Sequence, residues 1–124
     1  MCQTRILVVD DEPDIRTILR RLLMREGFCV AEAGDGLEAI DAAQRCDVQA
    51  IVMDINMPRM SGTEALRRLR EMPRFEKTPI MIITGNFLGG SYTAPTAFGD
   101  VTIIPKPLDL DALLAAIQEA VRPC

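Results

Sequence analysis

Short apolar runs alternate along the chain with segments in which apolar residues recur at helical spacing. Residues 6–9, Ile-Leu-Val-Val, indicate a buried strand. A first helix is indicated by apolar residues at positions i, i+3, i+4, i+7 and i+8, namely Ile15, Ile18, Leu19, Leu22 and Leu23. The same reasoning predicts strands at 28–33, 50–53, 79–83 and 101–104, and helices at 37–45, from 61 onward, and around 110–117.

Residues with known capping preferences mark where these helices begin and end. Pro13 suits a first helical turn, and Gly27 is a natural stop. Ser61 and Glu64 have the spacing of a capping box, and Asp109 precedes the last helix as its cap. The alternation of strands with helices predicts a single α/β domain over residues 1–124, a doubly wound, five-stranded parallel sheet with helices on both faces.

Composition and charge narrow the class of protein. The chain has 124 residues and a net charge of -4, which argues against direct nucleic-acid binding through surface charge. The uncharged interval 78–99 is interrupted by glycine, proline, asparagine and hydroxyl residues, so it does not predict a membrane span. Asp10 follows too short an apolar run for a signal peptide. We therefore expect a soluble, cytoplasmic protein.

The four cysteines are scattered, at Cys2, Cys29, Cys46 and Cys124, and there is no histidine. No pair has the C-x-x-C spacing, so a zinc site is not expected. Reduced thiols of a cytosolic protein are the simpler interpretation.

Polar residues follow most of the predicted strands at the point where each strand ends. Asp10 and Asp11 follow the first strand, and Asp54 follows the third. Thr84 ends the fourth strand, and Lys106 follows the fifth. Each residue alone has an ordinary structural explanation, such as a solvated acidic helix start or a turn. Together they converge, because sites of doubly wound sheets form at the carboxyl ends of the strands.

Carboxylates gathered at one edge repel each other unless a cation neutralises them. Ligand sets made of oxygen favour a hard ion, Mg²⁺ or Mn²⁺, that often takes a phosphate oxygen as a further ligand. A carboxylate beside such an ion can act as a nucleophile toward phosphorus, while a lysine and a hydroxyl hold the other phosphoryl oxygens. The pattern therefore indicates magnesium-dependent phosphoryl chemistry.

These motifs make the chain resemble the receiver domain of response regulators in bacterial two-component systems. The resemblance covers essentially the whole chain and rests on Asp10-Asp11, the run "MDINMPRMSG" around Asp54, Thr84 in "IITG" and Lys106 in "IIPKP". It implies a flavodoxin-like fold of five parallel strands and five helices.

The resemblance also implies roles for individual residues. Asp54 would accept a phosphoryl group from a sensor histidine kinase, a phosphotransfer protein or a small phosphodonor. Asp11, Asp54 and the backbone carbonyl of Asn56 would bind Mg²⁺, with Asp10 helping through a water. Lys106 would contact the phosphoryl group and Thr84 would move toward it. The domain would be a signalling switch with an unknown downstream protein target, rather than a turnover enzyme.

Two departures from the family pattern concern the output of the switch. The family usually has an aromatic residue three places before the lysine, where this chain has Ile103. The interval after Thr84 contains Gly89, Gly90 and Pro95, so the family's fourth helix is expected to be short, distorted or absent. Residues 85–106 and the last helix are then the surface expected to change.

Two other classes share parts of this pattern. A phosphohydrolase of the haloacid-dehalogenase type also uses a strand-end aspartate with Mg²⁺, but it requires a second aspartate where this chain has Asn56. A flavodoxin-like cofactor binder would have a first loop rich in serine, threonine and glycine, whereas the loop after residue 9 is acidic. Steady turnover of phosphate monoesters, or flavin absorbance, would favour one of these classes.

Overall fold

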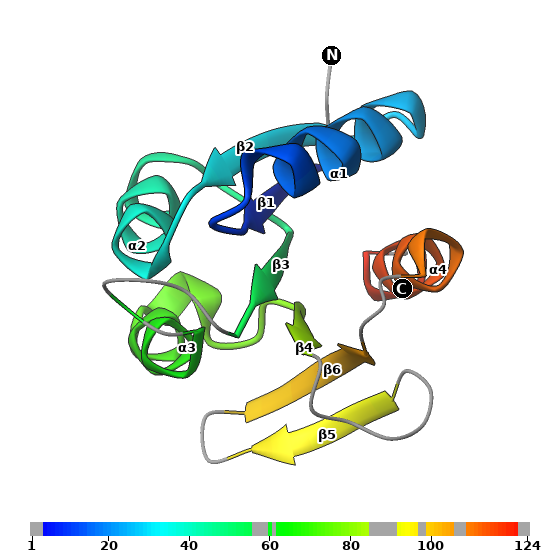
Figure 1. Cartoon of the computed structure of the whole chain (residues 1–124). Coiled ribbons are helices and arrows are strands. Elements are labelled where there is room, and N and C mark those ends of the chain that lie inside the picture. The colour runs from blue at the N-terminus through cyan, green and yellow to red at the C-terminus, as the bar shows by residue number, and fades with distance from the viewer. Residues whose placement is uncertain are drawn as a thin grey trace.

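Strands and helices alternate along most of the chain (Figure 1). The computed structural model describes residues 4–55, 60, 62–84, 92–96, 99–105 and 109–121. Its elements are β1 (Arg5–Val9), α1 (Pro13–Arg25), β2 (Cys29–Ala33), α2 (Gly36–Arg45), β3 (Ala50–Asp54), α3 (Gly62–Glu71), the 3-10 helix η1 (Pro73–Phe75), β4 (Ile80–Thr84), β5 (Tyr92–Thr96), β6 (Gly99–Pro105) and α4 (Leu110–Ala120). Every strand and helix predicted from apolar periodicity is present, with small shifts at the ends.

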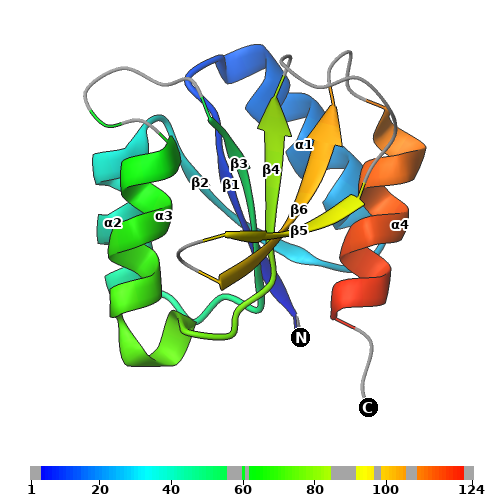
Figure 2. The same ribbon diagram turned by 90° about the horizontal axis from the view of Figure 1, so that it is seen from below.

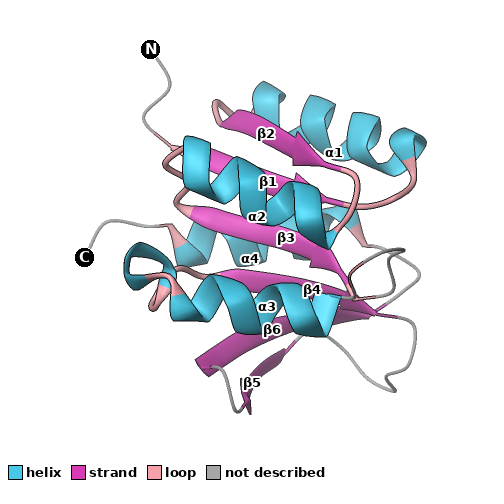
Figure 3. Cartoon of the chain, turned by 90° about the vertical axis from the view of Figure 1, so that its left-hand side faces the viewer, coloured by secondary structure: helices cyan, strands magenta, loops and turns pink. Residues whose placement is uncertain are grey.

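The sheet has the order β2-β1-β3-β4-β6-β5. The first five strands in this order pair in parallel, and β5 pairs antiparallel with β6. Helices α2 and α3 lie on one face, and α1 and α4 lie on the other (Figures 2 and 3). The predicted doubly wound α/β fold is therefore confirmed.

Alternate residues of each central strand supply the two halves of the core. Leu7 and Val9 of β1 belong to the cluster under α2 and α3, while Ile6 and Val8 belong to the cluster under α1 and α4. All residues of β3 and β4 are buried. Strands covered on both faces must be apolar throughout, which explains why these runs show no polar alternation.

Strand β5 is the main difference from the predicted fold. The expected sheet had five strands, all parallel, whereas the described part of the interval after β4 adds an antiparallel edge strand, Tyr92–Thr96. Pro95 lies within this strand, which an edge position permits because one side of the strand needs no hydrogen-bond donors. Pairing with β5 also extends β6 to Gly99–Pro105, beyond the predicted 101–104.

The predicted helix ends are largely confirmed. Pro13 is the first residue of α1, and Gly27 adopts a φ of 92° just after that helix. The Asp109 carboxylate accepts a hydrogen bond from Ala112 N–H at 3.1 Å and so caps α4. Ser61, the proposed cap of α3, lies outside the described residues.

One of the cysteines is not the reduced thiol that the sequence predicted. Cys46 is a free thiol, as predicted, but Cys29 at the start of β2 is disulfide-bonded, so the prediction that all thiols are reduced is wrong. The spacing of cysteines along the sequence could not exclude a disulfide, because the fold can bring distant cysteines together. Among the described residues no helix is both long and apolar enough to cross a bilayer.

Gly36 provides a test of how closely α2 packs on the chain that enters α3. A β-carbon at Gly36 would lie 2.8 Å from the backbone oxygen and side chain of Met60, which is buried. We expect Gly36→Ala to lower the free energy of unfolding by about 1–3 kcal/mol through overpacking. Helix propensity alone would instead raise it by about 1 kcal/mol.

Urea denaturation of the wild type and the variant measures this difference. Leu37→Ala is the matched control, because Leu37 is 42% exposed and its truncation should change the free energy of unfolding by less than about 0.5 kcal/mol. A more stable Gly36→Ala protein would show that α2 and Met60 separate easily.

Candidate functional site

The strand register brings two of the predicted acids together at the carboxyl edge of the sheet. Val9 of β1 pairs with Met53 of β3, so Asp10 and Asp54, the next residues along each chain segment, lie side by side. Both side chains are only 3% exposed. The two carboxylates therefore lie at the same edge of the sheet, close enough for the charge of Asp54 to raise the pKa of Asp10.

Thr84 joins the same edge from β4. It is 1% exposed, and Ile83 before it pairs with Asp54. On its other side Thr84 pairs with Pro105, the last residue of β6. Lys106 is the next residue along the chain and, like Asn56, lies outside the described residues.

The turn after β1 forms a compact group of carboxylates. One carboxylate oxygen from each of Asp10, Asp11 and Glu12 lies within 4.8 Å of the other two. Asp10 is buried, whereas Asp11 and Glu12 are exposed. The Asp10 N–H donates to the carbonyl of Ala33 at 3.1 Å, and the Glu12 N–H donates to Asp10 Oδ1 at 2.9 Å. The backbone therefore holds one oxygen of the buried carboxylate in a fixed direction.

Burial makes the Asp10 carboxylate hard to ionise without a compensating cation. Its pKa is raised from 3.8 to about 6, mainly by desolvation and in addition by the negative charges of Asp54, Asp11 and Glu12. The hydrogen bond from the Glu12 N–H acts in the opposite direction and lowers it. A bound divalent cation would relieve both the burial penalty and the repulsion, so the donor set fits a hard metal ion.

Arg16 of α1 was not singled out in the sequence, yet it contacts this turn. Its Nη1 donates to the backbone carbonyl of Asp10 at 2.6 Å, and its Nε lies 3.5 Å from Glu32 Oε1 on β2. A cation in the first turn of a helix is disfavoured by the helix dipole. That unfavourable placement is the one sequence signal that could have pointed to Arg16.

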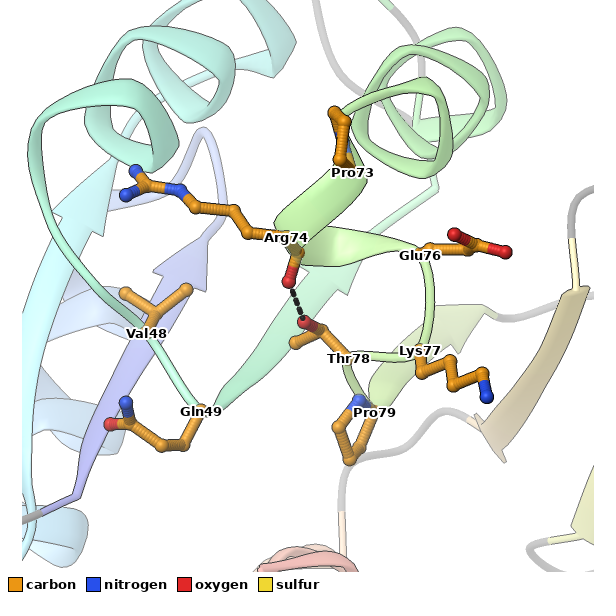
Figure 4. A pocket seen from close by; sticks show the side chains of 8 residues that line it. All are labelled: Val48, Gln49, Pro73, Arg74, Glu76, Lys77, Thr78 and Pro79. Carbon is orange, nitrogen blue, oxygen red and sulfur yellow. Dashed lines mark hydrogen bonds between the residues drawn. The ribbon is translucent and has the colours of Figure 1, made fainter.

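A surface pocket of about 410 Å³ lies at the opposite end of the sheet, next to the amino-terminal ends of β3 and β4 (Figure 4). The residues that line it are Val48, Gln49, Pro73, Arg74, Glu76, Lys77, Thr78 and Pro79. Its arginine is already engaged, because Arg74 Nη1 lies 2.8 Å from Asp47 Oδ1 and Nη2 donates to the carbonyl of Ala43. This pocket contains none of the predicted site residues.

Comparison with known proteins agrees with the fold and the acidic edge. Residues 6–118 match the family described as the response regulator receiver domain, so the chain belongs to that family. The family is that of two-component signalling, and its members act as phosphorylation-dependent switches.

Among curated relatives, response regulator MprA of Mycobacterium leprae is 37% identical over 95% of this chain and 51% of that protein. The chain thus spans about half the length of the curated relatives it matches.

Solved structures place the chain among receiver domains as well. Chemotaxis protein CheY4 of Vibrio cholerae has a TM-score of 0.82 at 31% identity, covering 94% of this chain and 98% of that one. The receiver domain of sensor histidine kinase PA1611 from Pseudomonas aeruginosa has a TM-score of 0.81 at 26% identity, covering 97% and 98%. That structure has a magnesium ion coordinated in its active-site cleft.

The raised pKa of Asp10 predicts how stability without metal depends on pH. A carboxyl whose folded pKa is about 6, against 3.8 ordinarily, stabilises the fold fully below about 3.8, and this contribution is lost as pH rises through about 6. In EDTA at pH 7.5, Asp10→Asn should therefore raise the free energy of unfolding by about 1–3 kcal/mol. At pH 4.5 most of this gain should disappear, as measured by urea denaturation.

Asp14→Asn is the control for loss of one negative charge nearby. Asp14 is exposed in the first turn of α1, where the helix dipole favours a carboxylate, so its loss should lower stability by about 0.5 kcal/mol. Equal gains from both substitutions would mean that net charge, rather than burial of Asp10, governs the effect.

Proposed function

We propose that Asp54 is the phosphoacceptor of this receiver domain. The observation that carries this proposal is the register that sets the buried Asp54 beside Asp10 at the carboxyl edge of the sheet. Asp54 stands at the end of a central strand, beside the acids in the turn that follows β1. A nucleophile next to a cation needs such an arrangement. The phosphoryl donor would be a sensor histidine kinase, a phosphotransfer protein or a small molecule such as acetyl phosphate.

Mg²⁺ is the cation that this donor set suits, and Mn²⁺ should substitute for it. Asp11, Asp54 and the carbonyl of Asn56 would bind the ion, with Asp10 acting through a water. The ion would supply charge neutralisation for the phosphoryl oxygens and for the acids around them. The chain's own contribution is to hold Asp54 buried at the carboxyl end of β3.

Thr84 and Lys106 complete the proposed site. Thr84 is buried at the end of the neighbouring strand, at the same edge of the sheet as Asp54. Its hydroxyl could therefore respond to a phosphoryl group on Asp54. Lys106 directly follows Pro105, whose pairing with Thr84 brings the chain to this edge. Its ammonium would contact phosphoryl oxygens and would repel the metal ion.

The output surface would be the β5–β6 hairpin together with α4. Strand β6 pairs directly with β4 at Thr84, and β5 pairs with β6. The hairpin is therefore well placed to report a movement of Thr84. Ile103 is buried and pairs with Ile82 and Tyr92. Because isoleucine has no aromatic ring, a ring rotation at this position cannot carry the signal. The signal would then pass to an unidentified protein target through the edge strand.

Phosphorylation of Asp54 is tested with acetyl phosphate and Mg²⁺. Intact mass should increase by one phosphoryl group in the wild type and stay unchanged in Asp54→Asn, which lacks the nucleophilic oxygen. Omission of Mg²⁺ should abolish the increase in the wild type. Full labelling of the Asp54→Asn protein would place the acceptor elsewhere.

The output proposal predicts a local change in hydrogen exchange. Beryllofluoride with Mg²⁺ should slow amide exchange in 92–105, because Thr84 would be drawn toward the acceptor and the neighbouring strand would follow. The same treatment of Asp54→Asn is the control and should change nothing. Changes confined to α4 in the wild type would assign the output to that helix alone.

A further inference from the structure

We propose that Arg16 is a positioning residue, which sets the direction of the Asp11 carboxylate by holding the backbone carbonyl of Asp10. The inference rests on the proposed function, since it concerns the metal site assigned there. Arg16 would not touch the metal, the phosphoryl group or Asp54. Its role would be to keep an exposed acid aimed at the ion.

Asp11 needs such a restraint more than the other proposed ligands do. Asp54 is buried at the end of a strand and Asp10 is buried just after one, whereas Asp11 is exposed in a turn. The Asp10 carbonyl and the Asp11 N–H belong to one planar peptide unit. Arg16 Nη1 donates to that carbonyl at 2.6 Å, so it fixes the plane from which the Asp11 side chain departs.

Arg16 is itself anchored on the edge strand. Its Nε lies 3.5 Å from Glu32 Oε1, and only 22% of its side chain is exposed. Glu32 is next to Ala33, whose carbonyl accepts the Asp10 N–H at 3.1 Å. The end of β2 therefore holds both peptide groups of Asp10, one directly and one through Arg16.

The space around the guanidinium is limited by the loop after β2. A β-carbon at Gly34 would lie 3.3 Å from Arg16 Nη1, so the chain passes close to the guanidinium at this point. The Gly34 N–H donates to Glu38 Oε1 at 3.0 Å, which ties that loop to the first turn of α2. Contacts on several sides favour one orientation of Arg16.

The positioning role and simple electrostatics predict opposite changes in cation affinity when Arg16 is lost. Removal of a positive charge near the acids should strengthen cation binding if charge alone matters. Loss of a group that orients a metal ligand should weaken binding, typically by 10-fold or more. The sign of the change in affinity therefore separates the two.

The test uses Mn²⁺ as the spectroscopic probe, with free Mn²⁺ measured by electron paramagnetic resonance and Mg²⁺ added as competitor. Arg16→Met keeps the apolar stem but removes the donors, and it should weaken Mn²⁺ binding about 10-fold. Arg16→Lys restores the charge and one donor, and it should recover part of the loss. Asp11→Ala should weaken binding at least as much as Arg16→Met.

Arg20→Met is the matched control. Arg20 lies on the same helix as Arg16, and its Nη1 is 3.4 Å from the same Glu32. The hydrogen bond to the Asp10 carbonyl, however, comes from Arg16. Its variant should lose a similar surface ion pair and keep Mn²⁺ affinity within about 2-fold. Circular dichroism and melting temperature compare the folds of the variants.

Unchanged or tighter Mn²⁺ binding by folded Arg16→Met would overturn the inference while leaving the proposed function intact. If Arg16→Met does not fold, Arg16→Leu, which also lacks the donors, is titrated in its place, and unchanged or tighter Mn²⁺ binding by that variant would overturn the inference. A wild-type chain that binds no Mn²⁺ would defeat the proposed function and this inference with it.

Discussion

Repulsion among carboxylates at one buried edge of the sheet is the constraint to which the site is adapted. Parallel pairing of β1 with β3 places Asp10 beside Asp54, and both are almost completely buried. Burial and like charges raise the pKa of Asp10 to about 6. The fold holds these acids in an unfavourable state that a divalent cation would relieve, so the proposed metal affinity would have the same origin as the cost of burying them.

The hydrogen bonds around the acidic turn explain how the chain tolerates this repulsion. The Asp10 N–H and carbonyl are held by Ala33 and Arg16, and its Oδ1 accepts from Glu12. These bonds fix backbone and carboxylate directions before any ion arrives. Preorganisation of this kind lowers the reorganisation needed for binding, and it places the edge strand β2 in an indirect role at the site.

The other edge of the sheet differs from the simple alternation of strand and helix. Strand β5 pairs antiparallel with β6, which in turn pairs with Thr84 at its end. A change at Thr84 would thus reach a two-stranded unit at the edge rather than a helix packed on the sheet. Edge strands have one free row of backbone groups, and this makes the hairpin suited to contact a partner.

The sequence by itself determined the α/β alternation and most element boundaries, because apolar periodicity is a local property of the chain. It also placed Asp10, Asp11, Asp54 and Thr84 at the ends of predicted strands, which made them candidates for one site. It could not determine β5, since the turn-forming and β-prone residues of that interval pair only when β6 is beside them. The same limit applied to Cys29 and to Arg16. Their partners are set by contacts between distant segments, and only the tertiary structure decides which segments meet.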